Sequence, residues 1–267
     1  MTALDVAPAH GAAPSLAARA RDVLSSEWTK LRSVRSTYWI LLIATVTAVG
    51  GSAVLALSTA SGGSTPFDPV ASIFVAWLEY PVLAVGILGV LAFSSEYSTG
   101  QIRTTYVAVP QRLAVLAAKA GVVGTVALVF GELLAFTSFF LSEAVLSGHH
   151  RGMSLSHPGV PGAVLAAGFS LFVIAMVGLG LGAIIRHTAG AVATLPALIY
   201  LPLIVLVLPG PWNYRIGRFT PLIAGYQAVS LHPRADLLSP GLSMVVLVAW
   251  PAAVLLGAAL LITRRDA

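Results

Sequence analysis

Six long apolar runs constrain the fold of this chain more than any other feature of its sequence. A helix needs about 20 apolar residues to cross the hydrocarbon core of a bilayer. The stretches that meet this length are Thr37–Leu57, Val70–Phe93, Leu113–Leu141, Val160–Ile185, Ala189–Leu208 and Leu242–Thr263. They are continuous rather than alternating, which favours helices over the strands of a membrane barrel. We therefore expect an all-α integral membrane protein with six transmembrane helices.

The composition fits lipid as the solvent of these helices. Of the 267 residues, 57% are hydrophobic and 9% are charged, whereas a soluble domain carries about 25% charged residues. The net charge of +5 is compatible with nucleic-acid binding. However, the basic residues stand at the ends of the apolar runs, which is typical of a membrane topology signal. We therefore expect a multi-pass protein in contact with a lipid bilayer, and no nucleic-acid partner.

The distribution of Lys and Arg predicts the orientation of the chain. If the N-terminus is cytoplasmic, the inner segments hold eleven of these residues and the outer segments hold four. Basic residues are concentrated on the cytoplasmic side of membrane proteins, so we expect both termini in the cytoplasm. Residues 209–241 then form the longest outer loop. Within it, residues 219–231 are too short to span a bilayer and predict a short helix at or in the outer leaflet.

Two segments precede the predicted membrane domain, residues 37–267. Residues 1–14 are rich in Ala and Pro and are expected to be a disordered cytoplasmic tail. Residues 15–36 carry apolar side chains at helical spacing among basic ones, which predicts an amphipathic elbow helix in the headgroup plane. The elbow residues singled out for function are Glu27, Trp28, Lys30 and Arg32. A plain basic anchor that sets the orientation is the alternative interpretation.

Missing motifs limit the chemistry of the chain. The sequence contains no P-loop, no H-E-x-x-H zinc motif and no cysteine. His149, His150 and His157 lie in a loop without a nearby Asp or Cys partner, so we expect no metal site there. No convincing Ser/His/Asp arrangement is present either. We therefore predict that the chain is not an enzyme and that it binds no cofactor itself.

Two carboxyl groups fall inside the apolar runs. Glu79 lies in the second run and Glu132 in the third. A carboxylate at the bilayer centre costs about 3 kcal/mol on insertion scales, so such groups usually face a bundle interior or a wet cavity. One interpretation is that Glu79 and Glu132 line a translocation path or form a proton-sensitive site. The other is that they are protonated and form hydrogen bonds between helices.

Residues 94–119 form a charged island between the second and third runs. The island carries Glu96, Arg103, Arg112 and Lys119 in a chain where charge is scarce. Gly100 is expected to end the helix before a short polar turn, because glycine breaks helices readily. The predicted orientation places the island in the cytoplasm, where its arginines would suit a carboxylate or phosphate of a partner. The alternative is that these charges only fix the topology.

The island resembles the coupling segment of ABC-2-type permeases, the membrane subunits of type V ABC exporters. The family pattern is an acidic residue, an aromatic residue, Gly, a Thr-like position, an apolar residue and Arg, followed by a Pro-x-x-Arg-like stretch and Lys. The matching residues are Glu96, Tyr97, Gly100, Gln101, Ile102, Arg103, Pro110, Arg112 and Lys119. Gln101 replaces the usual Thr, and Arg112 follows Pro110 by two residues. Residues 26–39 also look like the elbow of actinobacterial members.

The resemblance implies a permease subunit of a bacterial exporter of the cytoplasmic membrane, with an amphiphilic substrate. Its energy would come from a separate ATPase subunit, present in two copies, which binds ATP and Mg. The island would be the coupling helix that docks on this ATPase, with Glu96, Tyr97, Gly100, Arg103, Arg112 and Lys119 as the coupling residues. A second permease copy, identical or different, would complete the path as a homodimer or heterodimer.

Two other functions are compatible with the same sequence. The first is a proton-coupled secondary transporter that uses Glu79 and Glu132 and needs no ATPase. The absence of acidic residues from the last three runs, and of a visible repeat of the first half, argues against it. The second is a membrane sensor or assembly subunit that transports nothing.

Overall fold

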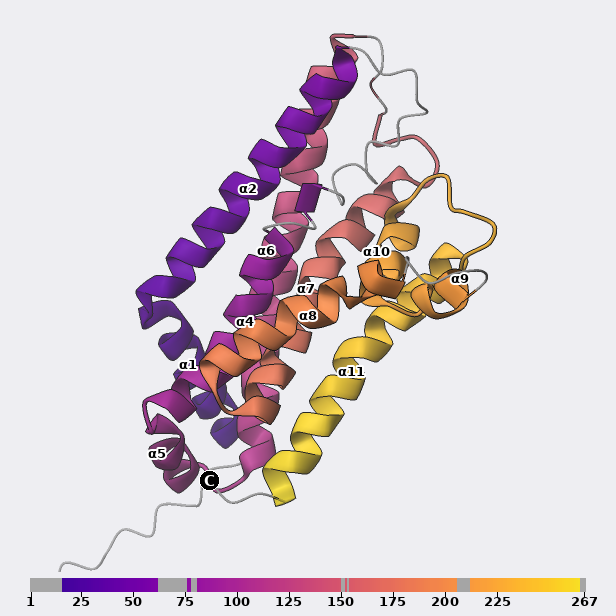
Figure 1. Ribbon diagram of the computed structural model, residues 1–267. Coiled ribbons are helices and arrows are strands. Elements are labelled where there is room, and N and C mark those ends of the chain that lie inside the picture. Colours follow the sequence, from indigo (N-terminus) through magenta and orange to yellow (C-terminus); the bar gives the residue numbers. More distant parts are fainter. Residues whose placement is uncertain are drawn as a thin grey trace, which may run out of the picture.

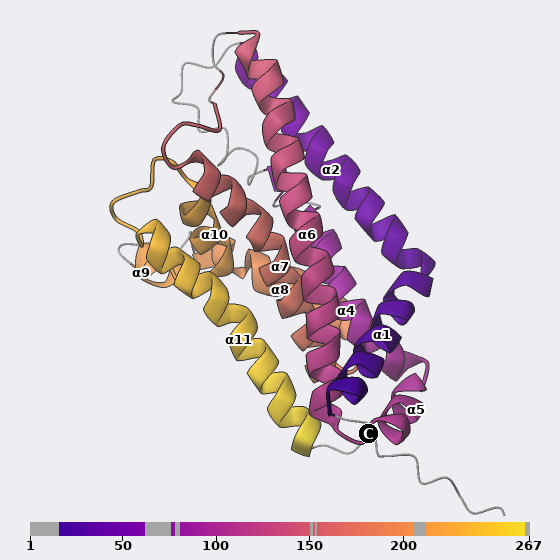
Figure 2. The same ribbon diagram turned by 180° about the vertical axis from the view of Figure 1, so that it is seen from behind.

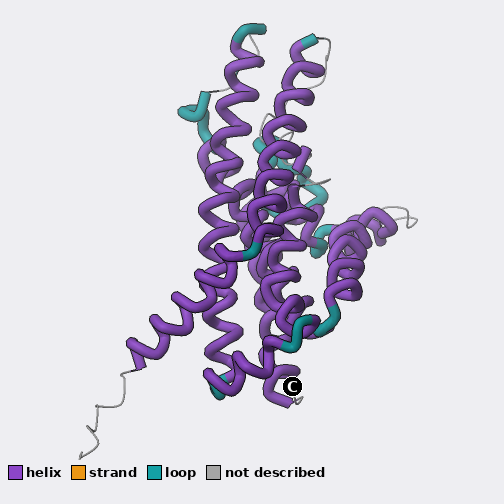
Figure 3. The backbone as a smooth tube through the Cα atoms, turned by 90° about the vertical axis from the view of Figure 1, so that its left-hand side faces the viewer, coloured by secondary structure: helices purple, strands orange, loops and turns teal. Residues whose placement is uncertain are grey.

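The described part of the chain is entirely helical. The computed structural model describes residues 16–61, 76–77, 81–149, 152, 154–205 and 212–264, and no strand occurs within them (Figure 3). The helices are α1 (Leu16–Ser33), α2 (Arg35–Ala60), α4 (Pro81–Ser98), α5 (Gln101–Ala108), α6 (Arg112–Ser147), α7 (Val160–Ile185), α8 (Thr188–Val205), α9 (Trp212–Gly217), α10 (Pro221–Val229) and α11 (Pro240–Arg264). The predicted all-α class is confirmed, whereas the predicted tail, residues 1–14, lies outside the described residues.

Several of these helices have the length and hydropathy of membrane spans. Among the described residues, five helices are long and apolar enough to cross a bilayer: α2, α4, α6, α7 and α11. The fifth predicted span corresponds to α8, whose apolar stretch, Thr188–Tyr200, is shorter than the others. The structure therefore confirms a multi-pass membrane protein, and the sixth span and the orientation stay predictions.

The helices do not end where hydropathy alone places their ends. Helix α6 has 36 residues and is about 54 Å long at the usual rise per residue, well above the bilayer core thickness of about 30 Å. It continues six residues past Leu141, the predicted end of the third run. Helices α2 and α6 lie side by side and project beyond the other helices at the upper end (Figure 1). The chain thus carries helical structure beyond the thickness of a membrane core.

Helix α7 is the centre of the bundle. It is buried along most of its length and packs against α4, α6, α8, α10 and α11. Helices α2 and α11 lie at the periphery (Figures 1 and 2), and most residues of their apolar stretches are exposed or half-buried, as expected for surfaces that face lipid. The bundle is therefore built around α7, most of whose surface is covered by the other helices of the protein.

Glycine brings α4 and α7 into backbone contact. Gly178 and Gly182 have G-x-x-x-G spacing on α7. A Cβ atom at Gly178 would collide with the carbonyl oxygen of Gly86, and one at Gly182 would lie 2.6 Å from that of Val90. Small residues at such positions let membrane helices approach closely and gain dispersion contacts. The spacing therefore serves the packing of α4 on α7.

We expect Gly178→Val to destabilise the bundle by about 1–3 kcal/mol or more, because overpacking forces neighbouring backbones apart. Gly50→Val on α2 is the matched control, since a Cβ there would meet no atom within 4 Å. Thermal unfolding in detergent would measure both variants. Equal midpoints for the two variants would contradict a tight α4–α7 contact.

Helix α10 is packed within the protein. It lies inside the predicted helix at residues 219–231 and contacts α7, α8 and α11. The buried Gln227 donates hydrogen bonds to the carbonyl oxygens of Arg234 and Leu238, at 3.2 and 3.1 Å, and its own amide oxygen accepts one from the Arg234 backbone. These bonds hold the following loop over the ends of α7 and α11.

Candidate functional site

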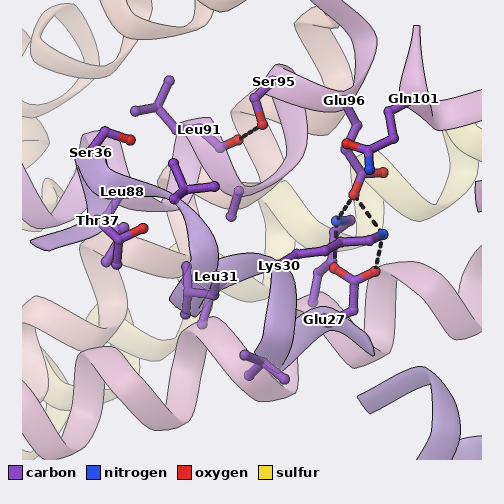
Figure 4. Close-up of a pocket in the computed structure, with 15 residues that line it drawn as sticks. Glu27, Lys30, Leu31, Ser36, Thr37, Leu88, Leu91, Ser95, Glu96 and Gln101 are labelled. Carbon is purple, nitrogen blue, oxygen red and sulfur yellow. Dashed lines mark hydrogen bonds and ion pairs between the residues drawn. The ribbon is translucent and has the colours of Figure 1, made fainter. Parts of the chain in front are cut away.

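A buried cluster of four charged side chains joins three helices at the lower end of the bundle. Glu27 and Lys30 come from α1, Glu96 comes from α4 and Lys119 comes from α6. Figure 4 shows Glu27, Lys30 and Glu96 pointing toward one another. We call these four residues the charge cluster. The cluster combines two elbow residues with two residues of the charged island.

The cluster alternates in sign. The Lys119 ammonium lies 2.6 Å from Glu27 Oε2 and 2.6 Å from Glu96 Oε1. The Lys30 ammonium lies 2.7 Å from Glu27 Oε1 and 2.9 Å from Glu96 Oε1. Each lysine therefore bridges the same two carboxylates, and the formal charges cancel. These are the only two lysines of the chain.

Burial makes this pairing obligatory. The exposed fractions of Glu27, Glu96 and Lys119 are 5%, 4% and 2%. Moving an ion out of water costs several kcal/mol even after relaxation, and removing one partner of a buried pair leaves this cost uncompensated. Lys119 also lies 5.7 Å from the ring centroid of the buried Phe93, which adds a favourable cation–π contact. The attraction between opposite charges therefore holds the cluster together, because each buried ion without its partners would carry an uncompensated desolvation cost.

Local structure brings the cluster residues to one place. Glu27 and Lys30 are three residues apart on α1, so they share one face of the helix. Val34 is extended, with φ −88° and ψ 119°, and separates α1 from α2. Because of this break, α1 lies across the lower part of α6 (Figure 2). The elbow thereby presents Glu27 and Lys30 to α4 and α6.

Helix α5 is attached to the cluster through a hydroxyl group. Thr105 Oγ1 donates to Glu96 Oε2 at 3.3 Å and accepts from Lys30 Nζ at 3.4 Å. Gly100 has φ +73°, a left-handed conformation that glycine adopts without strain, and it separates α4 from α5. Ile102 is buried against the bundle, with 3% exposed. The predicted polar turn after Gly100 is therefore a docked eight-residue helix.

Lys30 stays charged at neutral pH. Burial opposes protonation, but the hydrogen bonds from Lys30 to Glu27 and Glu96 outweigh it and raise the pKa of Lys30 above its ordinary value. The stability gained from these contacts is complete below the pKa of the unfolded chain. It is lost only as the pH rises through the raised pKa of the folded protein. The Lys30 contacts are therefore intact at physiological pH.

Two further cation–π contacts tie the neighbouring helix ends together. The Arg112 guanidinium lies 5.3 Å from the ring centroid of Tyr106 and donates to the carbonyl oxygen of Ile262 at 3.2 Å. The Arg186 guanidinium lies 5.2 Å from the ring centroid of Tyr97. These contacts connect α6 to α5 and α11, and the end of α7 to α4.

The other predicted residues do not join the charge cluster. Arg103 on α5 is exposed, as are Trp28 and Arg32 on α1. Glu132 lies on α6, far along the helix from Lys119, and is half-buried. Glu79 lies outside the described residues, so its predicted place in a translocation path or proton-sensitive site stays a prediction. The coupling residues thus separate into buried ones, such as Glu96 and Lys119, and the exposed Arg103.

Sequence reasoning missed two members of this region. Thr105 was not singled out, because a threonine in a short polar helix carries no distinctive signal. Arg186 was counted only as a topology charge, although its position directly after an apolar run is a signal for a capping or contact role. It has φ +58°, which is unusual for a residue with a side chain. The contact with Tyr97 accompanies this conformation.

A small cavity lies beside the charge cluster. It has a volume of about 140 Å³ and is lined by Glu27, Lys30, Leu31, Thr37, Leu88 and Glu96 among others (Figure 4). This volume is well below the 300–1,000 Å³ of typical ligand pockets. The cavity therefore suits a few water molecules between the elbow and α4 better than an organic ligand.

The fold and the cluster together define a class: an all-α, multi-pass membrane protein with a buried ionic junction between an amphipathic helix and the bundle. Comparison with known proteins adds no family, because no family model and no curated protein matches the chain. The function must therefore be inferred from the residues and their arrangement.

We expect Lys119→Met to lower the free energy of unfolding by about 3–5 kcal/mol, because the two carboxylates then share one ammonium group. Combining it with Glu27→Gln restores the charge balance, so the double variant should be more stable than Lys119→Met alone. Lys30→Met should cost less, since the Lys30 side chain is 28% exposed. Detergent unfolding monitored by circular dichroism would measure all three. A double variant no more stable than Lys119→Met would rule out charge imbalance as the cause.

Proposed function

We propose that the chain is the permease subunit of an ATP-driven exporter of the ABC-2 type, coupled to a separate ATPase. The observation that carries this proposal is the junction of α5 with the charge cluster. A short helix between two spans is attached through the Thr105 hydroxyl to Lys30 of α1 and Glu96 of α4, and Glu96 is in turn paired with Lys119 of α6. Such a helix is a means of passing a force from a partner into the bundle.

Helix α5 offers an outer face to such a partner. Ile102 anchors the helix inward, whereas Arg103 and Val107 are exposed and lie four residues apart on one face. Val107 is 83% exposed, so it gains from being covered by another surface. An arginine beside an apolar side chain suits a partner with a carboxylate next to an apolar groove.

The charge cluster gives the contact a mechanical consequence. If α5 is displaced, Thr105 moves relative to Glu96 and Lys30, and these two side chains must follow it or lose its hydrogen bonds. A hydrogen bond to a charged group contributes about 1.5–3 kcal/mol, and Glu96 and Lys30 are themselves paired with charges on other helices, so a displacement of α5 is passed to the helices that carry the cluster. In this proposal ATP and Mg are bound by two copies of the ATPase, and a second permease copy completes the path in a bacterial cytoplasmic membrane.

A proton-coupled transporter is the second candidate, because Glu132 Oε2 is buried without a hydrogen-bond partner among the described residues. A transporter of this kind would stop when the proton gradient is collapsed while ATP is kept constant. The exporter would continue under the same conditions. Efflux that is unchanged when the chain is deleted would instead indicate a sensor or assembly subunit.

We expect Arg103→Glu to lower co-purification of a P-loop ATPase at least tenfold from native membranes, because the substitution reverses the exposed charge of α5. Arg215→Glu on α9 is the matched control: it makes the same change at an exposed position far along the chain. Mass spectrometry and ATP hydrolysis of the purified complex would measure the partner. Normal recovery with Arg103→Glu would contradict docking through α5.

A further inference from the structure

A second cavity lies at the opposite end of the bundle from the charge cluster. It has a volume of about 660 Å³, within the 300–1,000 Å³ range of drug-sized ligand sites. It is an open pocket bordered by α6, the start of α7, the end of α10 with the following loop, and the start of α11. The residues that matter most here are Glu132, Gly162, Phe169, Leu231, Gly241 and Met244.

Close helix packing fixes the position of Glu132. A Cβ at Gly131 would collide with the carbonyl oxygen of Gly168, so α6 and α7 touch at this level. A Cβ at Gly168 would lie 2.6 Å from Glu132 Oε2, so the absence of a side chain there leaves room for the carboxyl group. The two glycines therefore hold the Glu132 side chain against α7, at the wall of the cavity.

One oxygen of the Glu132 carboxyl group, Oε2, is buried without a hydrogen-bond partner in the described part of the chain. Of the described side chains that line the cavity, Glu132 is the one that can ionise, and most of the others are apolar. A carboxylate in apolar surroundings pays a large desolvation cost unless a cation pairs with it. The described walls of the cavity thus provide no positive charge to pair with a Glu132 carboxylate.

The remaining walls favour a bulky organic cation over a metal ion. Phe169 offers an aromatic ring, whose face attracts cations, and Met244 offers a polarisable thioether. A hard metal ion needs several oxygen ligands, and no group of three His, Cys, Asp or Glu comes together in the described part of the chain. A large apolar cavity with one carboxylate therefore suits an organic ligand that carries a single delocalised positive charge and is otherwise apolar.

We propose that this cavity binds a lipophilic organic monocation of drug size, with Glu132 as its counter-ion. The inference names the substrate class of the proposed exporter, and it rests on the proposed function for the step from binding to transport. Binding itself requires the chain alone. Glu132 also shares α6 with Lys119, so the helix that lines the cavity is the helix held by the charge cluster.

Tetraphenylphosphonium binding to the purified chain tests the proposal. The measurement uses isothermal titration in maltoside micelles, whose headgroup carries no ammonium group that could compete. Tetraphenylborate is the control ion, because it has nearly the same shape as tetraphenylphosphonium and the opposite charge. We expect tetraphenylphosphonium to bind and tetraphenylborate to bind at least tenfold more weakly. Equal affinities for the two ions would overturn the proposal.

Three variants locate the binding site. Glu132→Gln keeps the shape of the side chain and should weaken tetraphenylphosphonium binding at least tenfold. Glu143→Gln makes the same change on the same helix, away from the cavity, and should leave binding unchanged. Gly162→Leu should also weaken binding, because Gly162 lines the cavity and a Cβ there meets no atom within 4 Å, so the new side chain takes up space in the cavity. Wild-type affinity in Glu132→Gln or Gly162→Leu would refute the site.

Two additional results separate this inference from its rivals. Stoichiometric displacement of tetraphenylphosphonium by phosphatidylethanolamine would assign the cavity to a lipid ammonium group and overturn the proposal of a drug-sized ligand.

ATPase co-purification should be normal in Glu132→Gln. A chain that fails to bind the cation but still recovers the ATPase would contradict the cation site alone. A chain that binds the cation but recovers no ATPase would contradict the proposed exporter alone.

Discussion

Two ammonium groups and two carboxylates that have lost most of their water hold α1, α4 and α6 together, and the Thr105 hydroxyl attaches α5 to them. Their mutual attraction offsets the cost of leaving water only while all four stay in contact, because one missing partner leaves a buried charge. Apolar packing alone would let α1 slide along the bundle with small losses. The ionic contacts instead define one position of α1 and penalise intermediate ones.

This constraint connects the two ends of the molecule. Lys119 and Glu132 are thirteen residues apart on α6, about 20 Å along a continuous helix. A displacement of α5 that moves Lys119 is therefore transmitted to the cavity wall by a stiff element. The glycine contacts between α4 and α7 and between α6 and α7 have little room for adjustment. In the proposed exporter, docking at one end and ligand binding at the other act on the same helices.

Much of the fold follows from the sequence, because runs of about 20 apolar residues have few stable solutions in a bilayer. The apolar runs identified all five long helices, and the amphipathic spacing of residues 15–36 predicted a helix where α1 lies. The ends of the helices were less predictable. The length of an apolar run reflects the thickness of the bilayer core, whereas a helix can continue through polar residues, as α6 does through Ser142, Glu143 and Ser147.

The members of the charge cluster were recognised, but their assembly was not. Glu27 and Lys119 are 92 residues apart, and their contact depends on how α1 folds back across α6. No local pattern encodes that direction. One signal was present: Lys119 falls inside a predicted apolar run, and a buried lysine requires a carboxylate partner. The chain has only five glutamates, so few glutamate partners are available to this lysine.

Amide hydrogen exchange in the Lys119→Met variant tests most directly whether the charge cluster holds α1 and α5 on the bundle. Local opening is reported by exchange in the segment that opens. We expect faster exchange in α1 and α5 than in the wild-type protein, with the glycine-packed centre of α7 unchanged. Unchanged exchange in α1 and α5 would show that apolar packing alone fixes these helices, and would contradict the role assigned to the charge cluster.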